Sequence, residues 1–206
     1  MCLHIMPRGG TMTRPEKQHR EKLVKINELV VECPVCSRKT LRIEDYLYDM
    51  PLVGKVLLTS AKCNSCGYRF TDVRLAEAHG PRKIVYRVEK PEDLNVIVVK
   101  ASSASIVVPE LDLKMMPGPA ATGFITTVEG VFDRFLEALE AACSSPDADR
   151  EACKRARKLI LDAKEGRVKF TLVIVDPEGI SAIVSEKARV EPVKREELEE
   201  LGYIVA

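Results

Sequence analysis

Runs in which apolar and polar residues alternate fill most of the chain, and they predict β-strands. Thr40–Tyr48 and Lys55–Lys62 alternate in this way on either side of Met50-Pro51-Leu52-Val53-Gly54, whose residues favour a turn. We therefore expect a long hairpin. Shorter strand-like runs follow, separated by polar or proline-bearing links: Ile84–Val88, Asn95–Val99, Ser105–Val108 and Glu110–Met115. Their close spacing predicts an antiparallel sandwich or barrel.

After Thr126 the spacing of the apolar residues changes from the period of a strand to that of a helix. Thr126-Thr127-Val128-Glu129 fits a capping box, in which the Thr126 hydroxyl oxygen accepts a hydrogen bond from the Glu129 amide. Apolar residues then recur at helical spacing: Val128, Val131, Phe132, Phe135, Leu136 and Leu139. A second helix over about 148–164 ends before Gly166, so we expect a helical hairpin over about 127–165. Cys143 and Cys153 lie on it and are interpreted as small core residues.

The two ends of the chain carry further elements. Arg14–Val31 looks helical at its start and extended at its end. Later elements are two strands and an acidic helix: Arg167–Val175, Gly179–Ser185 and Glu196–Leu201. We expect an α+β fold that is mainly β. It comprises a tail and lead-in segment (1–30), a ribbon (31–75), a β-domain with the helical hairpin (76–190), and a C-terminal acidic helix and tail (191–206).

Composition, charge and the absence of certain motifs argue against several classes of function. The 206 residues include 32 Lys and Arg against 31 Asp and Glu, so the net charge of +1 draws the whole chain to neither nucleic acid nor membrane. Apolar runs such as Val168–Val175 fall far short of the roughly 20 residues that span a bilayer. Cys2–Met6 is too short for a signal-peptide core, so we expect a cytoplasmic protein. The motifs of phosphate loops, dinucleotide sites, nucleophile elbows and zinc proteases are absent from the sequence, so we expect no enzyme.

Four of the seven cysteines form two identical spacings, Cys33-Pro-Val-Cys36 and Cys63-Asn-Ser-Cys66. A two-residue gap lets both thiolates reach one ion at about 2.3 Å, and four thiolates complete the tetrahedron that Zn²⁺ prefers. The spacing therefore predicts one structural zinc ion in a ribbon. Two disulfides, a redox pair and a catalytic zinc are the alternatives. A reducing compartment weighs against disulfides, and four cysteine ligands leave no open position for catalysis.

These pieces, in their order along the chain, resemble the ZPR-type zinc-finger family over roughly Glu32–Ser185. The pieces are the CPVC and CNSCGYRFTDV knuckles, the MPLVG stretch, KPEDLNVIVVKASSASIVVPELDL, TTVEG and FTLVIVDPEGIS. The resemblance implies a ribbon similar to the zinc module of the translation initiation factor two beta subunit and a β-domain like a double-stranded β-helix. Because the module occurs once, the chain is similar to the single-module archaeal branch.

The resemblance also implies a function. Members of the family are non-enzymatic adaptor or chaperone-like proteins, and the implied partner is the GTP-binding translation elongation factor one-alpha. From the residues themselves, the hairpin turn offers an apolar patch for a partner, formed by Tyr48, Met50, Leu52 and Val53 with their neighbours. The same patch could instead pack on the β-domain. The alternative function is binding of RNA or the ribosome through basic residues of the ribbon: Arg38, Lys39, Arg42, Lys62 and Arg69.

Overall fold

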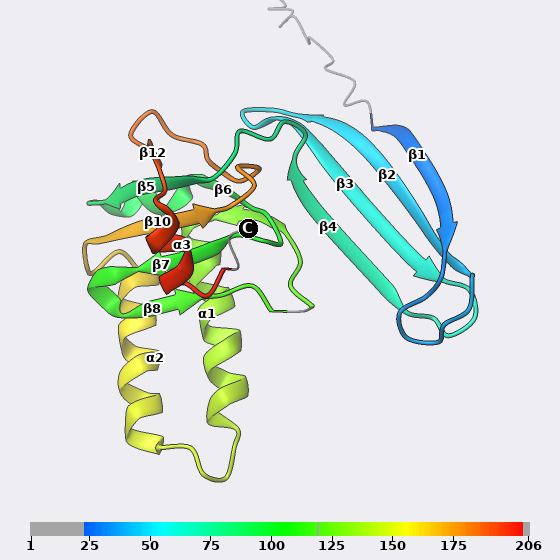
Figure 1. Cartoon of the computed structure of the whole chain (residues 1–206). Helices are drawn as coiled ribbons and strands as arrows, with labels where there is room; N and C mark the ends of the chain where they lie inside the picture. Colours follow the sequence, from blue (N-terminus) through cyan, green and yellow to red (C-terminus); the bar gives the residue numbers. More distant parts are fainter. Residues whose placement is uncertain (1–22, 119, 204–206) are drawn as a thin grey trace, which may run out of the picture.

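A four-stranded antiparallel sheet opens the described part of the chain, which comprises residues 23–118 and 120–203 of this computed structural model (Figure 1). Its strands lie in the order β1-β2-β3-β4. Their bounds are β1 (Val24–Val31), β2 (Leu41–Met50), β3 (Gly54–Cys63) and β4 (Arg69–Leu75). The predicted hairpin is confirmed, with Met50 opposite Gly54 at the turn and Leu41 opposite Cys63 at the other end. We call this sheet with its loops the ribbon.

Strand β1 lies in the segment that we expected to lead into the ribbon. It pairs with β2 from Val24 to Val31, so the four-stranded sheet begins at Val24. The expected extended end of Arg14–Val31 is therefore confirmed. The expected helical start of that segment falls outside the described residues.

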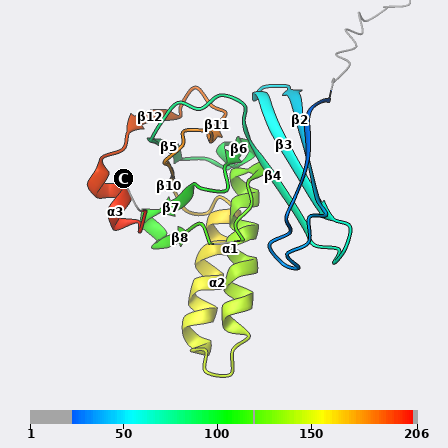
Figure 2. The same ribbon diagram turned by 45° about the vertical axis from the view of Figure 1, so that its right-hand side comes forward.

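Two further antiparallel sheets and a pair of helices form the β-domain, which lies beside the ribbon (Figure 2). One sheet has the order β12-β5-β10-β7-β8 and the other β11-β6-β9. The strands are β5 (Arg82–Val88), β6 (Ile97–Lys100), β7 (Ser105–Val108), β8 (Leu113–Met115), β9 (Phe124–Thr127), β10 (Phe170–Asp176), β11 (Ala182–Ile183) and β12 (Arg189–Pro192). The helices are α1 (Val128–Cys143), α2 (Arg150–Lys164) and α3 (Arg195–Glu200).

The large apolar core lies in the β-domain, where the helical hairpin meets the sheets. The start of α1 buries Val128, Val131, Phe132 and Phe135, and the end of α2 buries Ile160 and Ala163. The ring of Phe132 packs edge-on against that of Phe170 at 4.9 Å between centroids. Because only these ends are buried, the rest of the hairpin projects beyond the sheets (Figure 1).

The expected capping box at Thr126 is wrong by one residue. The N-cap is Thr127, whose side-chain oxygen accepts from the Gly130 amide at 3.2 Å. Thr126 is held instead in β9, opposite Val98. A Cβ at position 130 would lie 2.0 Å from the Thr126 hydroxyl oxygen, so the strand and the helix can meet this closely only with glycine there.

The interpretation of Cys143 and Cys153 as small core residues is also wrong, because the two form a disulfide. Helix α1 ends at Cys143 and α2 begins at Arg150, so the hairpin brings its last and first turns together at the projecting tip. The disulfide closes a short loop there, far from the buried ends of the helices. Such a bond is typical of oxidising compartments or of heat-adapted intracellular proteins.

The expected strand over Glu110–Met115 begins only at Leu113. Pro109–Leu111 forms a short 3₁₀ turn, and Asp112 follows in the left-handed conformation with a φ of 50°. The Glu110 carboxylate turns toward β10, where it accepts from the Thr171 amide at 2.9 Å and from the Thr171 hydroxyl at 2.7 Å. This anchoring of a side chain overrides the alternating pattern of the sequence.

The ribbon is attached to the β-domain along β4. The Asp72 carboxylate accepts from the Gly123 amide at 2.6 Å and from the Ser102 hydroxyl at 3.2 Å. The Leu75 amide donates to the Ile180 carbonyl at 2.9 Å. The backbones approach so closely that a Cβ at position 123 would lie 2.1 Å from the Val73 carbonyl oxygen. Glycine at this position is therefore a condition of the contact.

We expect Gly123→Ala to lower the free energy of unfolding by about 1–3 kcal/mol, because the added methyl group must push β4 away from the β-domain. Urea denaturation measures this change. Gly118→Ala is the matched control, since a Cβ there meets nothing within 4 Å, and it should shift stability by less than about 0.5 kcal/mol. Equal effects of the two substitutions would contradict the role of Gly123.

Candidate metal centre

The two cysteine turns have the same backbone structure, although they differ in sequence. In each, the amide after the second cysteine bonds to the carbonyl of the first, and the amide of the first cysteine bonds to a carbonyl five residues on. The bonds are Ser37 N to Cys33 O (2.8 Å), Cys33 N to Arg38 O (2.9 Å), Gly67 N to Cys63 O (3.1 Å) and Cys63 N to Tyr68 O (2.8 Å). This geometry points both cysteines of each turn toward the other turn.

The residue after the second cysteine is left-handed in both turns. Gly67 has a φ of 76°, which glycine adopts without strain, whereas Ser37 has a φ of 54° and carries the cost of its Cβ. The sequence indicated the bend only at Gly67. Alignment of the two CxxC spacings would have placed Ser37 at the equivalent position.

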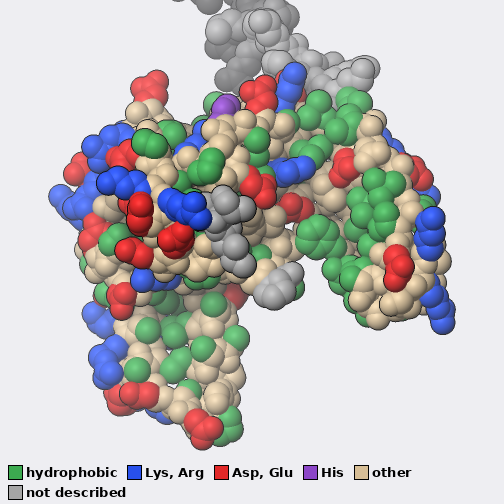
Figure 3. Space-filling model, in the orientation of Figure 1, with side chains coloured by type: hydrophobic (Ala, Val, Ile, Leu, Met, Phe, Trp, Pro, Cys, Tyr) green, Lys and Arg blue, Asp and Glu red, His purple; other side chains and the backbone are tan. Residues whose placement is uncertain are grey.

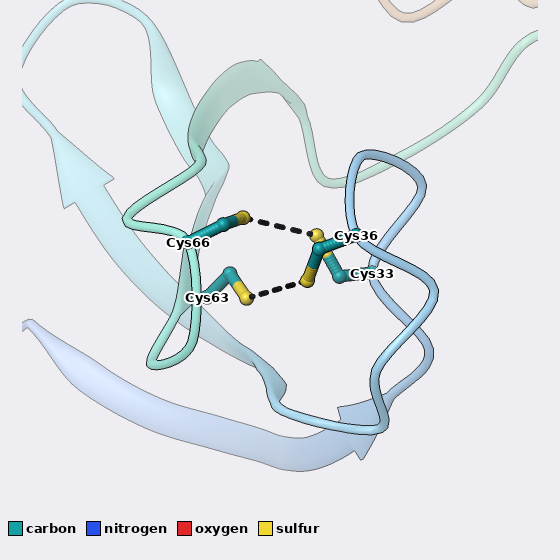
Figure 4. A group of neighbouring side chains, drawn as sticks. All are labelled: Cys33, Cys36, Cys63 and Cys66. Carbon is teal, nitrogen blue, oxygen red and sulfur yellow. Dashed lines mark hydrogen bonds between the residues drawn. The ribbon is translucent and has the colours of Figure 1, made fainter.

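The four sulfur atoms lie together (Figure 4). They are at the end of β2 and β3 where Leu41 pairs with Cys63, opposite the hairpin turn. Cys33 Sγ is 3.7 Å from Cys66 Sγ, Cys36 Sγ is 3.7 Å from Cys63 Sγ, and all four atoms lie within 4.8 Å of one another. A tetrahedron with zinc–sulfur bonds of about 2.3 Å has edges of about 3.8 Å. Both the donor set and its spacing therefore fit one zinc ion.

Hydrogen bonds to one sulfur favour its ionised form. The Thr40 hydroxyl lies 3.3 Å from Cys63 Sγ, and the Ser65 amide donates to the same atom at 3.4 Å. Thr40, with the backbone amides of Cys66 and Ser65, lowers the pKa of Cys63 to about 6. Thr40 is a supporting residue that the sequence did not indicate.

The pKa of a second cysteine, Cys66, is shifted in the opposite direction. The Tyr68 amide favours the thiolate of Cys66, but loss of water and hydrogen bonds with the three neighbouring sulfur atoms raise its pKa to about 12. Four thiolates at this spacing repel one another, and a divalent cation removes that repulsion. The electrostatics of the cluster thus favour an occupied metal site.

The ribbon has little apolar core beside this cluster. The buried residues around it are Cys33, Leu41, Ala61 and Cys63, with a few half-buried neighbours such as Ile43 and Phe70. So small a core provides little of the free energy needed to order four strands. Metal binding would supply the rest, as it does in other small zinc modules.

The predicted apolar patch at the hairpin turn lies at the other end of β2 and β3, about 30 Å from the sulfur cluster for strands of this length. Leu52 projects into solvent with 82% of its surface exposed, in the left-handed conformation at a φ of 68°. Tyr48, Met50 and Val53 are half-buried. Val53 lines a hollow of about 390 Å³ with Leu75, where the ribbon continues toward the β-domain.

Comparison with known proteins places the chain in a family. Residues 92–203, more than half of the chain, match the family model described as the ZPR1 jelly-roll domain. The chain belongs to the ZPR1 family. A ZPR1-like protein of Pyrococcus horikoshii is 36% identical over 98% of this chain and 93% of its own length. A ZPR1-like protein of Methanocaldococcus jannaschii is 37% identical over 83% and 88%, respectively.

Other members of the ZPR1 family are longer. The zinc finger chaperone zpr1 of Schizosaccharomyces pombe is 31% identical over 70% of this chain, which spans only 33% of that protein. The family resemblance seen in the sequence is thereby confirmed, including its single-module archaeal form. No helix among residues 23–118 and 120–203 is long and apolar enough to cross a membrane.

We expect the purified protein to hold one zinc ion and Cys63→Ser to lose it, because three thiolates and a hydroxyl bind zinc far more weakly than four thiolates. Loss of the ion should remove amide-exchange protection across residues 33–70 and leave the β-domain protected. Elemental analysis and hydrogen exchange measure the two effects. The double variant Cys143→Ser/Cys153→Ser controls for loss of cysteine and should retain the ion. Metal-free wild-type protein, or a ribbon unaffected by Cys63→Ser, would rule out the zinc site.

Substitutions at the two left-handed positions, Ser37 and Gly67, should change the stability of the ribbon in opposite directions. Gly67→Ala adds only backbone strain, since a Cβ there meets nothing within 4 Å, and should destabilise the ribbon by about 1–2 kcal/mol. Ser37→Gly relieves strain and should leave stability unchanged or raise it by up to about 1 kcal/mol. The extent of zinc release to a competing chelator, measured for each variant, ranks the two variants by the stability of their metal centre. Destabilisation by Ser37→Gly greater than that by Gly67→Ala would contradict the equivalence of the two turns.

Proposed function

We propose that this ZPR1-family protein is a non-enzymatic adaptor or chaperone whose zinc-organised ribbon binds a protein partner, translation elongation factor one-alpha. Two observations from relatives support the chaperone role: the family itself and the name of the Schizosaccharomyces pombe relative, a zinc finger chaperone. The elongation factor comes from the resemblance seen in the sequence.

The distribution of exposed apolar side chains carries this proposal. Among the described residues, seven of the nine exposed large apolar side chains lie between residues 23 and 52: Leu23, Val24, Ile26, Leu29, Val30, Val35 and Leu52. The space-filling view shows apolar side chains gathered on the ribbon (Figure 3). They are spread along the ribbon, with Val35 in the first cysteine turn, Leu52 at the hairpin turn and four on β1, and such exposed apolar side chains mark sites of protein–protein contact. The ribbon is therefore the surface that we assign to the partner.

Leu52 supports the assignment from backbone geometry. A left-handed leucine costs about 1–2 kcal/mol, and an exposed leucine gains nothing from burial in the free protein. Burial of this side chain by a partner would contribute about 1.5–3 kcal/mol, which is enough to offset the backbone strain. The zinc centre and the Asp72 contact hold the ribbon in shape before binding, and such pre-organisation lowers the entropic cost of association.

A second candidate function is binding to an anionic surface such as RNA. The strand register places Arg42, Lys62 and Arg69 in one row across three strands. Arg42 is paired with Glu28 and Glu44, whereas Lys62 and Arg69 have no ion pair among the described residues. Like charges directly opposite one another destabilise a sheet. Lys62 also points to the sheet face opposite that of Cys63, so this row does not neutralise the sulfur cluster.

Calorimetry with elongation factor one-alpha in its GDP-bound and GTP-bound forms tests the first function. We expect binding to at least one form, and Leu52→Gly should weaken it at least tenfold, because burying a leucine contributes about 1.5–3 kcal/mol. The same substitution should leave stability unchanged or slightly raised, since glycine relieves the positive φ. Val190→Gly, which removes an exposed apolar side chain from the β-domain, should leave the affinity unchanged.

The outcomes separate the two functions. Absence of heat with both forms of the factor would overturn the first function. Affinity for RNA that falls steeply with added salt, and that is lost in Lys62→Gln/Arg69→Gln, would establish the second. Wild-type affinity in Leu52→Gly would remove the turn from the binding surface.

A further inference from the structure

Strand β1 is the one long open sheet edge in the described part of the chain. The ribbon order β1-β2-β3-β4 leaves β1 and β4 at the edges, and β4 is attached to the β-domain through the Asp72 and Leu75 contacts. Strand β1 pairs with β2 on one side only. A bulge between Lys25 and Asn27 interrupts it, so its other side is a regular edge over Asn27–Val31. An open edge offers unpaired backbone amides and carbonyls that can accept another strand.

The side chains of β1 favour pairing of this edge with another strand. Val24, Ile26, Leu29 and Val30 are all among the exposed large apolar residues, and they divide between the two faces of the strand. Charged residues normally protect such edges from pairing. Here Lys25 bonds to Glu44 on the neighbouring strand at 2.6 Å.

The second charge on β1 is also directed inward. Glu28 pairs with Arg42 at 2.9 Å and with Lys25. These ion pairs tie the charges of β1 to its existing neighbour β2. The outer side of the strand is therefore left with apolar side chains and free backbone groups.

The other sheet edges in the described part of the chain are protected or covered. Strand β9 lies against β4, next to the bond between the Gly123 amide and the Asp72 carboxylate. Strand β12 consists of Arg189, Val190, Glu191 and Pro192, so charge and proline block pairing there. Strand β8 has only three residues, with Lys114 at its centre, and β11 has two. By contrast β1 has eight residues and no proline. A protein that protects its minor edges and leaves its longest one open keeps that edge for a partner.

We propose that β1 accepts an extended apolar segment of the protein partner as a fifth strand of the ribbon sheet. This inference rests on the proposed chaperone function, and it specifies the mode of binding. Backbone hydrogen bonds along the edge would supply affinity with little sequence demand. Leu29 on one face and Val30 on the other would cover apolar side chains of the added strand. Incompletely folded proteins expose such unpaired apolar strands.

A partner's strand fits this edge better than a second copy of the chain. Pairing two β1 strands would involve about eight residues from each copy, against roughly 20–30 per side in a stable interface. A larger partner can continue its contacts onto both faces of the ribbon and onto Leu52. We therefore assign the β1 edge to a strand of the protein partner. Pairing with a second copy of the chain is the alternative outcome of the test.

Amide exchange by NMR, with the full chain and elongation factor one-alpha, tests the added strand. In the free protein, alternate amides of β1 from Asn27 to Val31 should exchange fast, because only every second residue of this regular stretch bonds to β2. In the complex those fast amides should become protected at least tenfold. Contact through side chains alone would leave this alternation unchanged.

Variants provide the second arm of the test. Ile26→Lys/Val30→Lys should weaken the complex at least tenfold, whereas Ile26→Thr/Val30→Thr keeps β-branched side chains and should retain most of the affinity. Val190→Lys on β12 is the matched control for an added charge and should bind as the wild type does. Zinc content, measured for each variant, confirms that the ribbon has folded.

Each outcome supports or overturns the inference. Protection of the fast amides in the complex, with weakened binding only in the lysine pair, supports it. A complex that leaves them fast overturns the added strand but not the proposed function, whereas absence of any complex overturns both. Protection that rises with protein concentration in the free chain assigns the edge to a second copy. If the fast amides of β1 are protected in the free chain at every protein concentration, and removal of residues 1–22 abolishes this protection, the edge is assigned to that segment.

Discussion

Binding of one cation by four cysteine sulfurs, which would relieve the repulsion among their thiolates, is the interaction on which we propose that the ribbon depends. The sulfurs of Cys33, Cys36, Cys63 and Cys66 lie within 4.8 Å of one another, in a module with very few other buried side chains. The β-domain is different, because its core of sheets and helices accounts for its own stability. We therefore expect a β-domain that folds by itself and a ribbon whose order depends on a metal ion.

The ribbon is held at two places, and the surfaces that we propose for binding lie between and beyond them. A zinc ion would fix the end with the cysteine turns, and the contact of Asp72 with Gly123 fixes β4 to the β-domain. This leaves the open edge β1 and the turn at Leu52 exposed and yet held in shape. A surface of this kind can bind apolar segments without first losing conformational entropy. We therefore propose that zinc supports binding by ordering the ribbon and makes no contact with the partner itself.

Local signals made the metal centre and the hairpin predictable, and long-range contacts explain most of what was missed. Identical CxxC spacings located all four sulfurs, and alternation located β2 and β3. The N-cap was placed one residue early because pairing with β6 holds Thr126, and Glu110 left the strand pattern because its partner Thr171 is 61 residues away. The Cys143–Cys153 bond required knowing how the helical hairpin turns. The exposure of β1 could not be predicted, since an apolar strand looks the same in sequence whether or not a neighbour covers it.

The most direct test is a titration of zinc into the metal-free protein, followed residue by residue in the amide NMR spectrum. The structure predicts that without metal the ribbon signals, from Val24 to Leu75, collapse to an unfolded pattern while those of the β-domain persist, and that one equivalent of zinc restores them. A ribbon already ordered without metal, or one that needs a different number of equivalents, would contradict the claim that a single ion at four sulfurs organises it.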